Sequence, residues 1–384
     1  MAREFTSLIS LSTSRLLRSF VFTILAITSP FFLTQEGLGA FEIGLVIALS
    51  GGISTVFVYY FPRLGMSVRG ILLLAWILLV LSLLILVVEQ SALAYVVALL
   101  VGGIPLSGKD MSPNQALEQY SIGKNARDQR EKNTFFGYYN FLSYAGNTIA
   151  STLLLLDGEI GFREIFILSL AVAALSGIPY FFYRFPKYEK KPAGSTLSRE
   201  IRGLRNELAA LFSLDSFAGG LINSSMLSLW FLVVYSTTLT ETGFIFVVVN
   251  VLSAVSVLIS GKITTSIGMV RTMVYTHLVS NGFLVMMAVF HSLLFSEIML
   301  FARQTTSQMD VPPRDSFINT VIPERDRMRT NSQFIAARNA SIIPSPAAGG
   351  ALVEILPASI PALAGGLKAL YDAVFFARFH SYHD

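Results

Sequence analysis

Residues 70–88 read GILLLAWILLVLSLLILVV and carry no charged side chain between Arg69 and Glu89. The hydrocarbon core of a bilayer requires about 20 apolar residues per helix. Because no water is available there to pair with the backbone, a segment of this length must be helical. This stretch therefore predicts a transmembrane helix.

Similar segments follow one another along the whole chain of 384 residues. The predicted spans are residues 11–33, 41–60, 70–88, 92–112, 133–156, 162–182, 208–235, 242–261, 269–290, 292–312, 331–352 and 356–377. The composition agrees, because only 14% of the residues are charged, whereas a soluble domain has about a quarter. We expect an all-α polytopic membrane protein with twelve transmembrane helices as two pseudo-symmetric six-helix bundles.

The same composition excludes several classes of protein and site. Disordered chains and nucleic-acid-binding domains need far more polar residues than this chain has. The chain has no cysteine, which excludes disulfides, thiolate zinc sites and cysteine nucleophiles. No cofactor, no metal and no nucleic-acid partner are expected.

The distribution of basic residues predicts the orientation of the spans. Of the 28 basic residues, 20 fall in the tails and loops of one side, and only Arg163 lies in a loop of the other. Lysine and arginine accumulate in cytoplasmic loops. We therefore expect a multi-pass protein of the cell membrane, a monomer surrounded by the lipid bilayer, with both termini in the cytoplasm.

The chain contains an internal repeat around a polar midpoint. Residues 184–207 form the one long polar stretch and predict a cytoplasmic linker between an N-terminal bundle, 1–183, and a C-terminal bundle, 208–384. The motif DMSP at 110–113 aligns with DVPP at 310–313, an offset of 200. Further matches at nearly the same offset favour duplication of a six-helix unit, as is common in transporters.

A few charged side chains lie within the predicted spans, where they are costly and usually face a cavity or each other. They concentrate on the first, fourth and fifth helices of each half, whereas the helix at 269–290 has no charged residue in its apolar core. The stretch 133–151 also places polar and small residues every three or four positions, which is one face of a helix. We expect these helices to line a wet pathway and the third helix of each half to face lipid.

The pattern resembles the major facilitator superfamily over essentially the whole chain. The family's loop motif G-x-L-a-D-R-x-G-R is matched only by FPRLGMSVR at 61–69, which lacks the aspartate. The string SPAAGG at 345–350 is similar to the antiporter motif G-P-x-x-G-G, but it lies on the eleventh span rather than the fifth. The resemblance implies two six-helix bundles around a central cavity, and secondary transport by alternating access.

Two charge clusters are expected near the cytoplasmic ends of the spans. We expect Arg18 to pair with Asp110, and Arg338 with Asp215 or Asp310, with Arg15 close to the first pair. One interpretation is a pair of static ion bridges. The other is a proton-sensitive latch, in which protonation of Asp110 or Asp310 loosens the pair and favours one conformation.

Arg303 is the best single candidate for substrate binding, because a cation in the middle of the membrane needs a counter-ion. That counter-ion is either a bound anion or an acidic neighbour. Further candidates could supply hydrogen bonds and stacking; they are Arg18, Asn140, Tyr144, Asn147, Asn223 and Trp230. Lys368 and Asp372, four residues apart, are expected to form a local pair.

The chain is not expected to be an enzyme, because it contains no hydrolase motif and no phosphate-binding loop. The leading hypothesis is a secondary transporter that exports a small organic solute, with protons as the coupling ion. Anionic and amphipathic compounds are the candidate solutes. A facilitator or symporter of a polar nutrient is the first alternative. A membrane sensor or scaffold that does not transport is the second.

Overall fold

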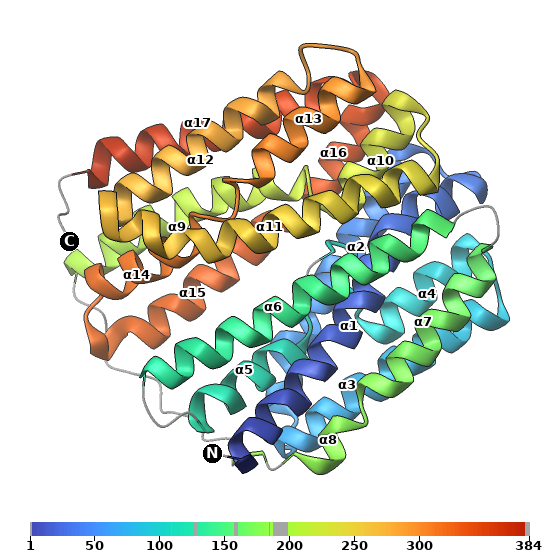
Figure 1. Cartoon of the computed structure of the whole chain (residues 1–384), viewed down its shortest axis with the longest axis horizontal. Coiled ribbons are helices and arrows are strands. Elements are labelled where there is room, and N and C mark those ends of the chain that lie inside the picture. The colour runs from blue at the N-terminus through green and yellow to red at the C-terminus, as the bar shows by residue number, and fades with distance from the viewer. Residues whose placement is uncertain are drawn as a thin grey trace. The chain divides into compact units, whose positions relative to one another are not determined.

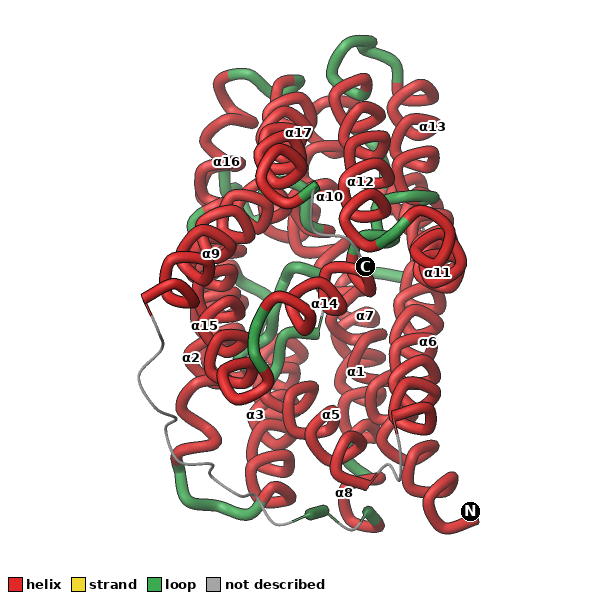
Figure 2. The backbone as a smooth tube through the Cα atoms, turned by 90° about the vertical axis from the view of Figure 1, so that its left-hand side faces the viewer, coloured by secondary structure: helices red, strands yellow, loops and turns green. Residues whose placement is uncertain are grey.

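A computed structural model describes residues 2–108, 110–125, 129–156, 160–183, 185–186 and 199–380. Within these residues the chain consists of helices and loops (Figures 1 and 2). The prediction of an all-α fold is therefore confirmed. Contacts between Cα atoms divide the chain into two units, Met1–Glu189 with Asn223–Asn250, and Lys190–Ile222 with Val251–Asp384.

The first unit contains most of the N-terminal helices. They are α1 (Ala2–Gln35), α2 (Ala40–Tyr60), α3 (Val68–Val88), α4 (Ala92–Gly102), α5 (Pro113–Asn125), α6 (Gln129–Leu153), α7 (Phe162–Ser176), α8 (Pro179–Phe182) and α10 (Ser224–Tyr235), with 3₁₀ turns at Phe61–Arg63 and Leu154–Leu156. Helix α1 packs against α6, α7 and α10 (Figure 1). It is the most enclosed of the spanning helices, with 89% of its apolar window buried.

The second unit contains the C-terminal helices. They are α9 (Arg199–Gly220), α12 (Met269–Met286), α13 (Leu293–Gln304), α14 (Val311–Val321), α15 (Glu324–Ile342), α16 (Ser345–Ile355) and α17 (Ser359–Phe379); α11 (Leu239–Ile267) is divided between the units after Asn250. Helix α12 runs beside α17, and α9 packs against both α15 and α17 (Figure 2). A core that includes Phe212, Phe317 and Phe375 holds these helices together.

Most of the predicted linker lies outside the described residues, at 184 and 187–198. Its last part, residues 199–207, is helical and begins α9. The reason is visible in the sequence, because Leu204, Leu208 and Leu211 recur at helical spacing and pack into the core of the second unit. The predicted bundle boundaries at 183 and 208 stay a prediction.

Among the described residues, six helices are long and apolar enough to span a membrane, or seven if α9 and α10 form one bent span. Several other predicted spans are interrupted. The predicted span 92–112 ends as a helix at Gly102, because Gly103 adopts the left-handed conformation with φ 56°. The chain becomes helical again at Pro113, which needs no backbone partner for its nitrogen in a first turn.

The predicted span 292–312 is interrupted at the corresponding place. Helix α13 ends at Gln304, and α14 begins at Val311 with a proline in its first turn. Asp110 and Asp310 both lie at the end of these interruptions, just before α5 and α14. Paired interruptions at matching positions of two sequence halves are a feature of transporter folds, and they agree with the predicted repeat. The total of twelve spans stays a prediction.

Candidate functional site

The first unit contains a buried group of charged and phenolic side chains, which we call the Arg18 cluster. Its members are Arg15 and Arg18 on α1, Asp110, Asn114 and Glu118 at or in α5, Tyr139 on α6 and Tyr180 on α8. The Arg18 guanidinium donates two bonds to the Glu118 carboxylate, at 2.8 and 2.7 Å. Such bidentate pairs are among the strongest charge-assisted hydrogen bonds.

Asp110 connects the two arginines of this cluster. Its Oδ2 accepts a bond from Nε of Arg18 at 2.8 Å and lies 2.6 Å from a terminal nitrogen of Arg15. The predicted pair of Arg18 and Asp110 is therefore present, with Arg15 beside it. Two positive and two negative charges balance, which removes the largest cost of burying them.

Two tyrosines complete the bonding of Glu118. The Tyr139 and Tyr180 hydroxyl groups each donate to its carboxylate at 2.5 Å. Glu118 thus joins four helices, because its partners come from α1, α6 and α8 while it lies on α5. The pairing of Glu118 with these tyrosines was not predicted, because one sequence does not show which distant side chains approach a given carboxylate.

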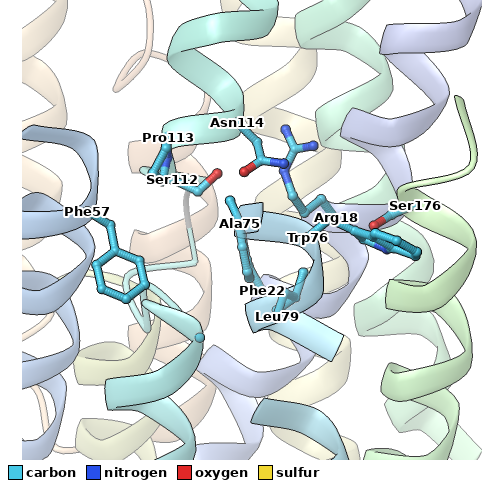
Figure 3. Close-up of a pocket in the computed structure, with 11 residues that line it drawn as sticks. Arg18, Phe22, Phe57, Ala75, Trp76, Leu79, Ser112, Pro113, Asn114 and Ser176 are labelled. Carbon is cyan, nitrogen blue, oxygen red and sulfur yellow. The ribbon is translucent and has the colours of Figure 1, made fainter. Parts of the chain in front are cut away.

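A small cavity borders the Arg18 cluster (Figure 3). It is lined by Arg18, Asn114 and Trp76 among others, with the Asn114 amide next to the guanidinium, and its volume is about 10 Å³. A cavity of roughly 10–15 Å³ holds about one water molecule. In this conformation the Arg18 cluster has no room for an organic ligand. Its geometry therefore fits a set of ion pairs that hold helices together better than it fits a substrate site.

The second unit contains its own charged group, which we call the Asp215 cluster. It consists of Asp215 on α9, His277 and Asn281 on α12, Asp310 and Arg314 at α14, and Lys368 and Asp372 on α17. The Lys368 ammonium donates to Oδ1 of Asp215 at 2.5 Å. A nitrogen of Arg314 lies 3.0 Å from Asp310 and 3.8 Å from Asp215. Asp215 thus has two cationic partners from different helices.

These partners differ from two of the expected pairs. Arg338 does not pair with Asp215 or Asp310, since its Nε donates to the Ser216 hydroxyl at 3.1 Å. The ion-pair partner of Lys368 is Asp215, where Asp372 was expected. A spacing of four residues on a helix permits a side-chain pair but does not require one. The Lys368 ammonium bonds instead to Asp215, a buried carboxylate on a neighbouring helix.

His277 also belongs to this cluster, a role that its place in the sequence did not indicate. Its Nδ1 lies 2.8 Å from Oδ1 of Asp372, and the Asn281 amide donates to the other oxygen at 2.8 Å. His277 is 5% exposed, so this helix contributes polar side chains to the interior of the unit, while Tyr275, Leu278 and Val279 on the same helix are exposed. The available signal was the spacing of His277 and Asn281, four residues apart on an otherwise apolar helix.

Arg303 is buried in the last turn of α13. It is 8% exposed and donates to the amide oxygen of Gln304 at 2.9 Å, while its Nε has no hydrogen-bond partner. Among the side chains that the structure describes, no carboxylate oxygen lies within 4.0 Å of it. Its role as a substrate ligand stays a prediction.

A larger cavity of about 290 Å³ lies in the second unit between α9, α14 and α15. We call it the Arg338 cavity; its walls are Phe212, Arg314, Asp315, Ile318, Asn331, Phe334, Ile335 and Arg338. Binding sites for small molecules begin at about 300 Å³ and combine apolar walls with a few polar groups. This cavity has that composition.

The remaining substrate candidates all lie in the first unit. Asn140 is exposed on α6, Tyr144 is half-buried, and the Asn147 amide lies 2.8 Å from the Thr23 hydroxyl of α1. Asn223 caps α10 by accepting a bond from the nitrogen of Met226. Trp230 is 1% exposed and packs edge-on against Phe231. Their substrate roles stay predictions, and the described contacts of Asn147, Asn223 and Trp230 are contacts within the fold.

No protein-family sequence model matches this chain, and no curated protein matches it by sequence. Solved structures do match it along nearly its full length. The human organic anion transporter MFSD10 (TETRAN) is 13% identical with a TM-score of 0.69, over 97% of this chain and 99% of that one. The nucleoside transporter NupG is 13% identical with a TM-score of 0.72, over 97% and 98%.

The POT family transporter PepTSo is 11% identical with a TM-score of 0.77, over 98% of both chains. At these identities the similarity establishes the fold. The chain has the fold of the major facilitator superfamily, as its sequence pattern predicted. These three matched proteins are described as transporters.

Proposed function

We propose that this protein is a secondary transporter that moves a small amphipathic organic solute with an anionic group across the membrane by alternating access. The observation that carries the proposal is the Arg338 cavity, which places two arginines and two phenylalanines around about 290 Å³ within a fold shared with transporters. Arginine binds carboxylates and phosphates well. Apolar walls beside it favour an amphipathic solute.

We further propose that protons are the coupling ion and that Asp310 is a proton-accepting group. Asp310 accepts a charge-assisted bond from Arg314, and Arg314 also borders the cavity. Protonation of Asp310 removes the negative charge from this bond, which weakens it and leaves Arg314 available for an anion. Asp110 is the corresponding aspartate of the first unit, because it lies just before α5 and accepts a bond from Arg18. The expected direction is export, driven by protons that enter.

Flux into and out of proteoliposomes, with and without a pH gradient, tests this proposal. Asp310→Asn should lower the gradient-driven rate at least about tenfold, because the variant cannot exchange a proton at that position. The matched control is Glu164→Gln, which removes an exposed carboxylate of α7 and should leave the rate unchanged. Full transport by Asp310→Asn with an unchanged pH optimum would refute the latch.

The same assay separates the two alternatives. A facilitator would carry the solute down its own gradient at a rate that the pH gradient does not alter. A sensor or scaffold would bind a ligand without any flux above that of protein-free vesicles.

A further inference from the structure

The Arg338 cavity contains two opposite charges that do not touch. Arg338 on α15 and Asp315 on α14 both line it, and the two are more than 4.0 Å apart. The Nε of Arg338 donates a hydrogen bond to the hydroxyl group of Ser216, which carries no charge. Among the described side chains, neither residue has an oppositely charged partner within 4.0 Å.

The third charged wall residue is already neutralised. The Arg314 guanidinium lies 3.0 Å from the carboxylate of Asp310, which is not one of the residues that line the cavity. The charges of the described cavity wall that have no ion-pair partner within 4.0 Å are therefore one positive and one negative, from Arg338 and Asp315. A ligand of matching chemistry has no net charge but carries one group of each sign.

Unpaired polar atoms add to this pattern. The side-chain oxygen of Asn331 and Nε of Arg314 are buried and have no hydrogen-bond partner. Both residues line the cavity. A buried polar atom without a partner costs about 1–3 kcal/mol, so these atoms favour a ligand that offers both a donor and an acceptor.

The rest of the wall is apolar. The Phe212 and Phe334 rings meet edge to face, with centroids 5.3 Å apart, and Ile318 and Ile335 extend this surface. Aromatic and branched side groups pack well against such a surface. The cavity thus has a charged part with both signs and an apolar part within about 290 Å³.

We infer that the Arg338 cavity binds a small zwitterion with an apolar side group, of the amino-acid type. Its carboxylate pairs with Arg338, its ammonium group faces Asp315 and the Asn331 oxygen, and its side group packs against Phe212 and Phe334. This inference rests on the proposed function, for which it names the substrate class.

Equilibrium binding to the purified full-length protein in detergent tests the inference without requiring transport. The probes are phenylalanine, 3-phenylpropanoate, which lacks the ammonium group, and 2-phenylethylamine, which lacks the carboxylate. Phenylalanine should bind at least about tenfold more tightly than either analogue, because each analogue leaves one wall charge unpaired.

Two variants test which wall residue pairs with the carboxylate of the ligand and which pairs with its ammonium group. Arg338→Gln should weaken phenylalanine and 3-phenylpropanoate by the same factor. Asp315→Asn should weaken phenylalanine and leave 3-phenylpropanoate unchanged, so that the two bind alike. Arg271→Gln, which removes an exposed arginine of α12, is the control and should change neither. Since Asp315 is exposed, its variant should keep the unfolding temperature of the parent protein.

Equal binding of phenylalanine and 3-phenylpropanoate to the parent protein would overturn the inference, as would an unchanged ratio in Asp315→Asn. The proposed function has a separate outcome. Zwitterion binding that follows the predicted pattern, without flux in proteoliposomes, would support this site and refute transport. Flux that Arg338→Gln and Asp315→Asn leave unaltered would support transport and refute this site.

Discussion

Single buried arginines and lysines hold several helices of this protein together. Arg18 is 2% exposed and bonds with partners from α5 and α8. Lys368 does the same between α17 and α9. Removal of one member leaves a buried charge without compensation, which costs far more than the net contribution of the intact pair. Stability measurements on single residues therefore test these clusters directly.

Arg18→Gln should destabilise the protein by about 3–5 kcal/mol, because Glu118 and Asp110 stay buried and lose their shared cation. Denaturation of the purified protein in detergent measures the effect. Arg378→Gln is the control; its ion pair with Glu207 is largely exposed, so the change should be at most about 1 kcal/mol. Equal stability of the Arg18 variant and the parent protein would show that the cluster is absent in solution.

A double-mutant cycle tests the pair of Lys368 and Asp215. Lys368→Met and Asp215→Leu should each destabilise the second unit, because each leaves the opposite charge buried. The double variant should be more stable than the two single effects predict, by roughly 1–3 kcal/mol. Additive effects would mean that the two side chains do not interact, and that the 2.5 Å contact has no energetic role.

At the scale of elements, the close packing of α1 on α6 depends on one glycine. A Cβ at Gly146 would lie 2.2 Å from the backbone oxygen of Leu16. Backbone atoms cannot give way as a flexible side chain can. The polar contacts on either side, Ser19 with Ser143 and Thr23 with Asn147, hold the same two helices at this distance.

Gly146→Ala should therefore destabilise the protein by about 1–3 kcal/mol, as overpacking does in other cores. Gly137→Ala is a matched control on the same helix, because nothing lies within 4 Å of its added Cβ. The control should be neutral or more stable by up to about 1 kcal/mol, since alanine favours helices. Thermal unfolding of both variants measures the difference, and equal effects would contradict the proposed packing.

The sequence predicted most helices from runs of apolar residues, but not where the helices break. The predicted span 92–112 looks continuous by hydropathy, and its end at Gly102 depends on one left-handed glycine that packs beside Phe57. Prolines in the first turns of α5 and α14 were visible in the sequence. The apolar composition of a segment indicates its affinity for lipid, but it does not show where the backbone leaves the helical conformation.

At the scale of the whole molecule, the succession of apolar segments and the resemblance to the major facilitator superfamily predicted the fold correctly. The candidate sites were predicted in part. Arg18 and Asp110 pair as expected. The sequence did not indicate that Arg338 faces a cavity or that His277 joins the Asp215 cluster. Pairing of side chains from distant helices depends on how each helix is rotated, and hydropathy along one sequence contains little of that information.

The most direct test of the central claim is solute flux in proteoliposomes under an imposed pH gradient. A panel of labelled amphipathic carboxylates that includes phenylalanine and 3-phenylpropanoate would be the probes, with protein-free vesicles as the reference. We predict that at least one probe crosses faster with the protein present, and that the pH gradient increases its rate. Rates equal to those of protein-free vesicles for every probe would contradict the account.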